Sequence, residues 1–306
     1  MFTLNSAPPP LRLATISVDV DPLDLHLQGY GVRGTGRDLK VYDVAIPRLL
    51  EIFSHAGIRA TFFFVASDIP GEPSAVAAVK RVAANGHEIA SHSLTHSIPF
   101  RKLPTGELRR ELALSKARLE EVAGCAVAGF RAPNWDMSRR EIPLLAELGY
   151  KYDASAYPSL FLCAARLFVS IGGGGLQTFT KLKFWPDWWE RSPFVIQTAN
   201  GKIVEFPIAT HGFIRFPIYH TTLSKVAREK AARWIAGCAQ STTHFSYAMH
   251  AIDVLTRGEV EFTQLQKHPT VRETRAEQVA VIHENLATIQ RHFRFVTYKE
   301  SVDLYL

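Results

Sequence analysis

The feature that most constrains the fold of this chain is an alternation of short, apolar, β-rich runs with longer amphipathic stretches. Within the amphipathic stretches, apolar side chains recur at the helical period, as Leu108, Leu112 and Leu119 do. The run ATFFFVA at 60–66 is apolar on both faces, which fits a strand of a parallel sheet that is covered on both sides. Strands that alternate with helices predict an α/β architecture, either a barrel or a doubly wound sheet.

The alternation extends along most of the chain. Strands are predicted at 14–20, 60–66, 87–91, 129–132, 203–208, 245–250 and 293–298, and helices at 44–55, 73–84, 105–122, 138–148, 223–239 and 273–292. No internal repeat and no linker rich in Pro, Gly or Ser divides the sequence, so we predict a single domain over 1–306. The segment 157–200 interrupts the alternation with an apolar stretch, consecutive glycines and several tryptophans, and we interpret it as an insertion.

Composition and charge narrow the functional classes. With 47% hydrophobic and 21% charged residues, the 306-residue chain is typical of a globular protein. Its 3 widely spaced cysteines exclude a disulfide framework, and no apolar run reaches the length of a membrane-spanning helix. The start of the sequence lacks the basic and apolar regions of a signal peptide, which predicts a cytoplasmic protein. The net charge of +6 arises from Lys and Arg interleaved with acids, so we do not expect binding to nucleic acid.

Two carboxylates stand at the end of the first predicted strand, in the sequence SVDVD. Asp19 and Asp21 are two residues apart, so in an extended strand both side chains point to the same face. Two like charges held side by side are costly unless a cation neutralises them, which makes the pair a candidate metal site. The alternative is a simple turn carboxylate, because Asp21-Pro22 is also a common turn opening.

Two histidines follow the third predicted strand, in the sequence GHEIASHSLTH. His92 and His96 have the spacing H-x-x-x-H, and two imidazoles four residues apart can face one metal ion such as zinc. With 12 histidines in the chain, such a pair also arises by chance. His87 lies at the start of the same strand, on the opposite edge of the sheet, and we interpret it as structural.

Three further side chains of chemical interest follow later strands. Arg131 and Trp135 lie in FRAPNWDMS, and His250 ends the run FSYAMH. Arg131 could hold a neighbouring carboxylate or pair with any surface acid, and His250 could be a general acid or a core histidine. All of these groups, with the Asp and His pairs, fall at carboxyl ends of strands, where α/β barrels build active sites. One Asp with two His would give three protein ligands and leave positions open for water and substrate.

The order D-x-D, H-x-x-x-H, R-x-P-x-W and a late strand that ends in His resembles the NodB-type polysaccharide deacetylases, carbohydrate esterase family 4. The resemblance extends from about residue 14 to residue 300. It implies a distorted (β/α)7-type barrel and a hydrolase that removes an N-acyl group, acetyl or formyl, from an amino sugar. It also implies one divalent metal, zinc first, with cobalt, nickel and iron(II) as alternatives.

The resemblance also implies roles for individual positions. It makes Asp19 the catalytic base, Arg131 the residue that holds it, His250 the general acid, Asp21, His92 and His96 the metal ligands, and Asn134, Trp135 and Asp153 substrate contacts. Two departures stand out. The adjacent Asp-Asp of secreted members is V-D-V-D here, as in the cytoplasmic branch. No residue clearly matches the family's aspartate that tunes the acid histidine, for which Asp153 and Glu205 are the candidates.

The predicted insertion bears on the substrate. Trp185, Trp188 and Trp189 stand among Lys and Arg, as side chains at a membrane interface do, and they predict contact with an anionic membrane surface. The alternative is that these tryptophans cap the core. The overall pattern is similar to the branch that contains a deformylase of polyprenyl-phosphate-linked formamido-arabinose. That similarity implies a lipid-linked amino sugar of the cell envelope and a peripheral position on the inner membrane.

Two other functions remain open from the sequence. One is an amidohydrolase acting on a small soluble amide, because an allantoinase-like branch of the same fold exists. The other is a non-catalytic carbohydrate-binding protein, which would be favoured by a replacement of Asp19 or of a metal ligand. The sequence retains all of these residues.

Overall fold

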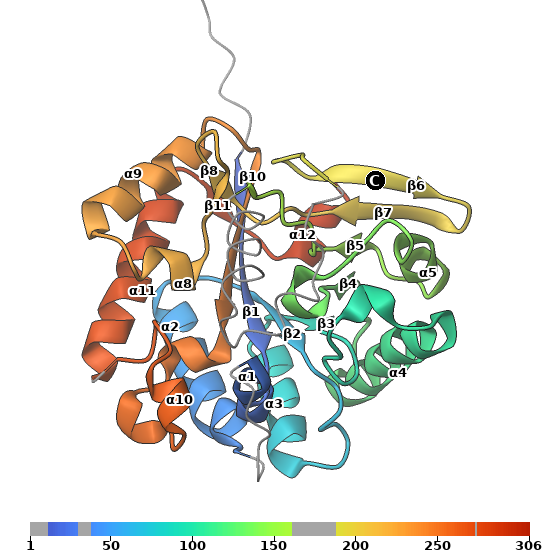
Figure 1. Ribbon diagram of the computed structural model, residues 1–306, viewed down its shortest axis with the longest axis horizontal. Helices are drawn as coiled ribbons and strands as arrows, with labels where there is room; N and C mark the ends of the chain where they lie inside the picture. The colour runs from blue at the N-terminus through green and yellow to red at the C-terminus, as the bar shows by residue number, and fades with distance from the viewer. Residues whose placement is uncertain (1–11, 30–37, 161–187, 273) are drawn as a thin grey trace, which may run out of the picture.

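A mostly parallel sheet runs through the centre of the molecule, with helices packed around it (Figure 1). The computed structural model describes residues 12–29, 38–160, 188–272 and 274–306. In spatial order the strands are β10 (His244–His250), β1 (Leu13–Val20), β2 (Thr61–Phe64), β3 (Glu88–Ser91), β4 (Gly129–Phe130), β5 (Tyr152–Asp153), β7 (Gly201–Glu205) and β6 (Phe194–Thr198), and β11 (Arg294–Phe295) pairs with β1. The predicted α/β class is confirmed. No pairing among the described residues joins β10 to β6, so no closed barrel forms there.

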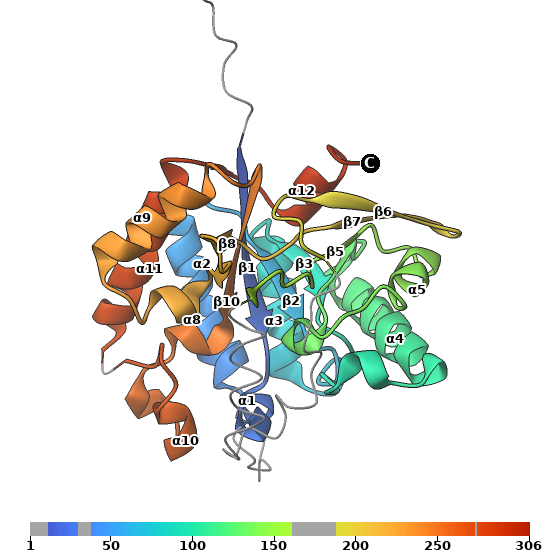
Figure 2. The same ribbon diagram turned by 45° about the horizontal axis from the view of Figure 1, so that its top comes forward.

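The six predicted helices are present, and four short α-helices are added to them among the described residues. The helices are α1 (Leu23–Gly29), α2 (Ile46–His55), α3 (Pro73–Ala84), α4 (Thr105–Ala123), α5 (Ile142–Glu147), α8 (His220–Leu223), α9 (Arg228–Cys238), α10 (Thr263–Gln266), α11 (Arg275–Gln290) and α12 (Tyr298–Val302). The predicted helices correspond to α2, α3, α4, α5, α9 and α11. Figure 2 shows α9, α11 and α2 on one side of β1, and α4 and α5 on the other. No helix in the described ranges is long and apolar enough to cross a membrane.

The central strands are buried on both faces, which explains their continuous apolar runs. Every residue of β1 and of β2 is buried, including the polar positions of β1. Parallel pairing of β1 with β10 places Asp19 directly beside His250, and pairing of β1 with β2 continues the same edge. The carboxyl ends of β10, β1, β2 and β3 therefore lie next to one another, which is the arrangement that brings the candidate site together.

The sequence prediction misses several elements: the short helices α1, α8, α10 and α12, strands β5 and β6, and a short hairpin. Strand β5 has only two residues, too few for a periodic pattern, and the hairpin of β8 (Thr210–His211) and β9 (Phe216–Pro217) is equally short. Strand β6 alternates half-buried and exposed residues and pairs antiparallel with β7 at the end of the sheet. It lies within the predicted insertion 157–200, so part of that segment belongs to the sheet. Residues 161–187 of that insertion lie outside the described residues.

Trp188 also corrects the interpretation of the insertion. Its side chain is only 5% exposed and packs against Phe194 of β6, with ring centroids 6.4 Å apart. A buried indole cannot reach a lipid surface, so Trp188 belongs to the core, as the alternative held. Trp185 lies outside the described residues, and Trp189 is half-buried with the guanidinium of Arg215 5.2 Å from its ring centroid.

Candidate active site

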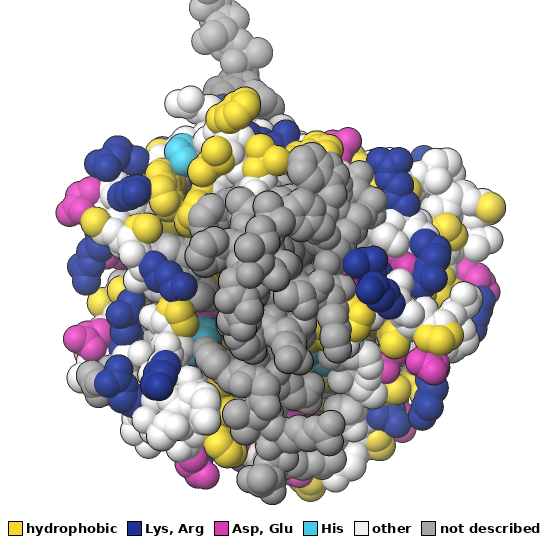
Figure 3. Space-filling model, viewed as in Figure 1, with side chains coloured by type: hydrophobic (Ala, Val, Ile, Leu, Met, Phe, Trp, Pro, Cys, Tyr) yellow, Lys and Arg dark blue, Asp and Glu magenta, His cyan; other side chains and the backbone are white. Residues whose placement is uncertain are grey.

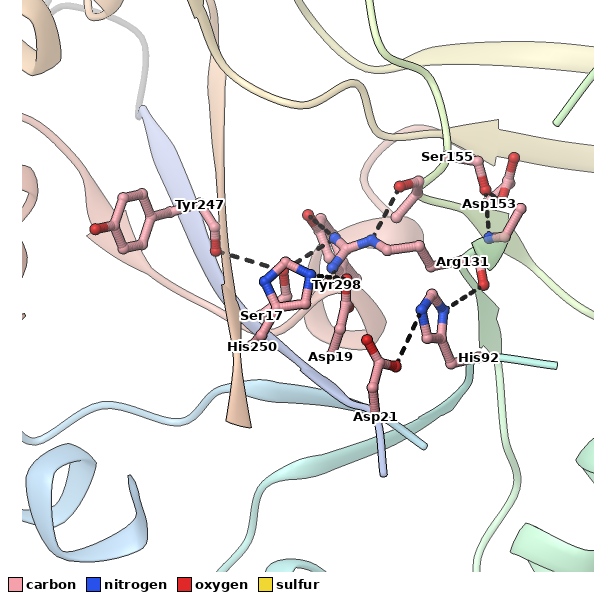
Figure 4. Close-up of polar contacts among 12 residues, drawn as sticks. Ser17, Asp19, Asp21, His92, Arg131, Asp153, Ser155, Tyr247, His250 and Tyr298 are labelled. Atoms are coloured by element: carbon pink, nitrogen blue, oxygen red, sulfur yellow. Dashed lines mark hydrogen bonds and ion pairs between the residues drawn. The ribbon is translucent and has the colours of Figure 1, made fainter. Parts of the chain in front are cut away.

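A buried carboxylate held by a buried cation lies at the carboxyl edge of the sheet (Figure 4). Asp19 Oδ1 accepts a hydrogen bond of 2.6 Å from Arg131 Nη1, and both side chains are almost fully buried. Its second oxygen, Oδ2, lies 3.9 Å from Nε2 of His250. The structure thus brings together the three side chains to which the sequence assigns the base, its holder and the acid.

Arg131 is fixed by several partners at once. Besides Asp19, it donates from Nη2 to Ser17 Oγ at 2.9 Å and from Nε to the carbonyl of Ala154 at 3.1 Å. Its guanidinium carbon lies 4.2 Å from the ring centroid of Phe63. Burial alone would lower the pKa of Arg131, but the charge and hydrogen bond of Asp19, together with the neighbouring tyrosines, raise it. Arg131 therefore stays charged and keeps the carboxylate of Asp19 in one orientation.

Asp21, His92 and His96 form the one group of metal-ligand type found among the described residues. Nε2 of His92 lies 3.5 Å from Asp21 Oδ1, and Nε2 of His96 lies 3.8 Å from the same oxygen. The ligand atoms all lie within 4.8 Å of one another. Asp21 Oδ1 is buried and has no hydrogen-bond partner among the described residues. An orphaned carboxylate oxygen that faces two imidazole nitrogens fits a divalent cation.

The protonation of the two imidazoles suits the same purpose. Nδ1 of His92 lies 2.7 Å from the carbonyl oxygen of Arg131, which can only accept a hydrogen bond. Nδ1 is therefore the protonated nitrogen, and the lone pair of Nε2 points toward Asp21. Burial lowers the pKa of His96 to about 4, so this ring is neutral near pH 7. Burial would raise the pKa of Asp21, but the neighbouring imidazoles lower it, so the carboxylate is ionised.

The loop that carries both histidines is held from behind by α4. Ser93 and His96 have left-handed backbone angles, φ 69° and φ 57°, which non-glycine residues adopt only when other contacts hold them. Oε2 of Glu111 accepts hydrogen bonds from the backbone N–H of Leu94 at 3.0 Å and of Thr95 at 2.9 Å. Its Oε1 accepts one from the Thr95 hydroxyl at 2.6 Å. The sequence did not predict a role for Glu111, because this residue bonds to the loop between the histidines and not to the metal site itself.

Replacement of Glu111 by Ala should weaken metal binding roughly 10- to 100-fold, as loss of an outer-shell partner of metal ligands does. The two ligands would remain, but the loop between them would lose three hydrogen bonds. The measurement is the metal affinity, obtained by titrating the metal-free protein with the metal ion in a calorimeter. Glu107→Ala, at an exposed position one turn earlier on α4, is the matched control and should bind metal as the wild type does. Equal affinities for the two variants would contradict this role.

An aromatic wall stands beside His250. The ring of Trp135 lies 5.3 Å from that of Tyr157, 5.9 Å from that of Tyr219 and 6.2 Å from that of His250, measured between centroids. The indole Nε1 of Trp135 is buried and has no hydrogen-bond partner among the described residues. Asn134 is half-buried in the same turn, with φ 52°. The predicted substrate contacts Asn134 and Trp135 thus lie at the site, and Tyr157 and Tyr219 extend the wall.

Two further groups near His250 were not assigned from the sequence. Asp253 Oδ2 accepts a hydrogen bond of 2.7 Å from the backbone N–H of His250, and its Oδ1 accepts one of 2.7 Å from Thr270 Oγ1. The ring of His26, on α1, lies 5.7 Å from that of His250, and its Nε2 lies 4.0 Å from Asp21 Oδ2. Asp253 could have been found from the sequence, because it follows His250 closely in the run MHAID. His26 could not, because its proximity to His250 depends on the direction in which α1 leaves β1.

Asp153 is not where the sequence analysis placed it. Its side chain is completely buried, and its Oδ1 accepts a hydrogen bond of 2.6 Å from Ser155 Oγ. The partners of Asp153 are Ser155 and Glu205, and the structure does not bring it to the site formed by Asp19, Asp21 and the histidines. Glu205, its neighbour on β7, is equally buried. Neither of these two candidates contacts the acid histidine; the carboxyl group that contacts His250, through its backbone N–H, is that of Asp253. His87 is buried, and its Nδ1 accepts from the backbone N–H of Ala60.

Part of the sequence matches proteins that are described as deacetylases. Residues 40–152 match the family model described as polysaccharide deacetylase. A peptidoglycan deacetylase of Helicobacter pylori is 30% identical over 148 residues, which are 47% of this chain and 49% of that protein. The uncharacterised protein YlxY of Bacillus subtilis is 28% identical over 102 residues, 33% of this chain and 31% of that protein. The chain thus matches about half or less of the length of these relatives.

Solved structures show the same fold. A Mycobacterium smegmatis protein assigned to the polysaccharide deacetylases superposes with a TM-score of 0.61 at 18% identity, over 98% of this chain and 92% of that one. Puue allantoinase gives a TM-score of 0.60 at 12% identity, over 98% and 94%. A Pseudomonas aeruginosa protein assigned to the polysaccharide deacetylases gives 0.58 at 14%, also over 98% and 94%. These likenesses show a shared fold, and the sequence match to the polysaccharide deacetylase model covers residues 40–152 of the chain.

Proposed function

We propose that this protein hydrolyses an N-acyl group, acetyl or formyl, from an amino sugar with the help of one divalent metal ion. The observation that carries the proposal is the pair of neighbouring carboxylates at the end of β1. Asp19 is bound to a buried cation, and Asp21 faces two imidazoles with an unpartnered oxygen. The match of residues 40–152 to the polysaccharide deacetylase model and the H. pylori relative, a peptidoglycan deacetylase, support the same class of reaction.

Asp21, His92 and His96 would hold the metal ion. When bound, such an ion acts as a Lewis acid that polarises the amide carbonyl and makes water acidic enough to attack at neutral pH. The remaining steps fall to the chain's own residues. Asp19, oriented by Arg131, takes the proton of the attacking water. The water oxygen bonds to the carbonyl carbon, and the C–N bond breaks as His250 gives a proton to the departing amine. Trp135 and the tyrosines beside it would orient the sugar.

The activity is tested with a panel of substrates at equal concentration. The panel contains N-acetyl and N-formyl amino sugars, free and linked to a polyprenyl phosphate, and allantoin as a small soluble amide. Release of acetate or formate from the sugars, but no ring opening of allantoin, is the expected result. Turnover of allantoin alone would instead favour the amidohydrolase alternative, whose fold-level likeness is noted above.

We further propose that the sugar is carried on a lipid at an anionic membrane surface. Phe213 and Ile214 form the tip of the β8–β9 hairpin and are 91% and 53% exposed. Arg191 donates to the carbonyl of Gly212 at 2.6 Å, and Arg215 lies over the ring of Trp189, so cations stand directly behind the apolar tip. Figure 3 shows hydrophobic side chains gathered at the top of this face, with Lys and Arg around them. Exposed apolar side chains backed by cations are typical of segments that insert into anionic lipid.

Binding to liposomes tests this part of the proposal. Phe213→Ser/Ile214→Ser should bind anionic vesicles at least about tenfold more weakly than the wild type, because each apolar side chain contributes roughly 1.5–3 kcal/mol when fully buried. Leu304→Ser/Leu306→Ser removes two other exposed apolar side chains, 67% and 43% exposed, and should bind as the wild type does. Equal vesicle affinity for wild type and hairpin variant would contradict the docking role of the hairpin.

A further inference from the structure

Two buried carboxyl groups lie side by side behind Arg131. Asp153 ends β5 and Glu205 ends β7, and the parallel pairing of these strands makes the two residues direct neighbours. Neither side chain is exposed to solvent. One oxygen of each group, Asp153 Oδ2 and Glu205 Oε2, is buried without a hydrogen-bond partner among the described residues. Two ionised carboxylates offer only acceptors, so this arrangement would leave two buried oxygens unsatisfied.

A single proton shared by the two carboxyl groups would join the two unpartnered oxygens in one hydrogen bond and leave only one negative charge. Adjacent carboxyls in a dry site cannot both ionise, and one of them then retains a proton with which it donates to the other. Burial raises the pKa of Asp153 to about 6, and burial together with the charge of Asp153 raises the pKa of Glu205 well above its ordinary value. The charged side chain that faces the pair is Arg131, from the end of β4, and it favours the ionised form of Asp153. The other facing groups, the Ser155 hydroxyl and the backbone N–H groups of 154–156, are neutral.

We propose that Asp153 and Glu205 share one proton and, as a pair, position Arg131 by clamping residues 154–156. Asp153 accepts the hydroxyl hydrogen of Ser155 at 2.6 Å, and Glu205 Oε1 accepts from the backbone N–H of Ala156 at 2.8 Å. Ala154 stands between the end of β5 and these two anchored residues, and its carbonyl accepts a hydrogen bond from Arg131. Figure 4 shows Asp153 and Ser155 beside the backbone of Arg131, on the far side from Asp19.

The clamp reaches the active site by two routes. Ala154 accepts a hydrogen bond of 3.1 Å from Arg131 Nε, which fixes the direction of the guanidinium toward Asp19. Ser155 Oγ accepts one of 2.8 Å from the backbone N–H of Ala132, which fixes the turn after Arg131. Asp153 and Glu205 are therefore positioning residues, since they touch neither substrate nor metal ligands. Only the kinetic part of this inference rests on the proposed function.

The test compares Glu205→Gln, Asp153→Ala and the metal-loaded wild type. Glutamine has the shape of the protonated carboxyl and a permanent N–H donor, so Glu205→Gln should retain kcat within about threefold. The infrared difference spectrum between wild type and Glu205→Gln should contain the C=O stretch of a protonated carboxyl. Asp153→Ala should lose about 10- to 100-fold in kcat with little change in KM, because a base misplaced by about 1 Å loses up to 10²-fold.

The stability of the wild type should also depend on pH in a way that Glu205→Gln does not. The folded-state pKa of Glu205 is raised above its unfolded value, so the stabilising protonated form is lost as the pH rises between the two. The Tm of Glu205→Gln should therefore increase relative to that of the wild type as the pH rises above 4.5, the ordinary pKa of a glutamic acid. Glu88→Ala removes another buried carboxyl, at the opposite end of the sheet, and is the control for a merely structural loss.

Absence of the protonated-carboxyl band at neutral pH, or parallel Tm curves for wild type and Glu205→Gln, would overturn the shared proton. A kcat of Asp153→Ala no lower than that of Glu88→Ala would overturn the positioning role. If the protein turned over no N-acyl amino sugar, the proposed function would fail, while the infrared and unfolding results would still decide the shared proton.

Discussion

Asp19→Asn is expected to lower kcat by about 10²- to 10⁴-fold, the contribution of a positioned general base. The amide cannot accept a proton from water, although its oxygen can still accept the hydrogen bond from Arg131 Nη1. Metal content should be unchanged, because Asp21, His92 and His96 provide the ligand set without Asp19. The measurement is the rate of acyl release from an N-acyl amino sugar, with the metal content of the same samples determined by elemental analysis.

The matched control for Asp19→Asn is Asp43→Asn, an exposed carboxyl remote in sequence from the site. It should have wild-type activity and metal content. A variant Asp19→Asn that retained more than a tenth of the wild-type kcat would contradict the role of Asp19 as base.

Arg131→Met is expected to lower the free energy of unfolding by about 3–5 kcal/mol, which is the cost of removing one partner of a buried ion pair. Arg131 and Asp19 are 1% and 2% exposed, so the carboxylate would be left buried without its cation. The hydroxyl of Ser17 and the carbonyl of Ala154 would lose their donor as well. Unfolding in urea, followed by circular dichroism, gives the free energy, and activity should fall with it.

A surface pair supplies the comparison for Arg131→Met. Arg109 binds Glu147 at 2.7 Å, but both side chains are nearly half exposed, and such pairs contribute little to stability. Arg109→Met should therefore unfold close to the wild-type urea concentration. Equal midpoints for Arg131→Met and Arg109→Met would show that the buried pair is not the stabilising element described above.

The part of the site that the sequence predicted follows from one rule. Asp19 and His250 lie at the ends of their strands, the His92–His96 loop and Arg131 come directly after theirs, and parallel strands bring their carboxyl ends to one edge. The register that makes Asp19 a neighbour of His250 completes this convergence. No tertiary contact is needed for such a prediction, because strand order along the chain and strand direction already determine it.

The part that the sequence did not predict depends on contacts between segments. Glu111 acts on backbone N–H groups of another element, and His26 reaches Asp21 only because of the direction in which α1 leaves β1. Asp153 and Glu205 become neighbours because β7, the second strand of an antiparallel pair, is the one that lies next to β5. Tryptophans among cations are equally typical of a membrane interface and of a cap on the core. The packing of Trp188 against β6 shows that this residue belongs to the core.

The most direct test of the metal-dependent site is the joint measurement of metal content and acyl release in wild type and in His92→Ala/His96→Ala. The wild type, after removal of metal by a chelator, should bind one divalent ion per chain and recover turnover in proportion to the ion bound. The double variant retains one carboxylate of the three ligand groups, and it should bind no ion with comparable affinity and release no acid. Full turnover by a metal-free double variant would contradict the proposed mechanism.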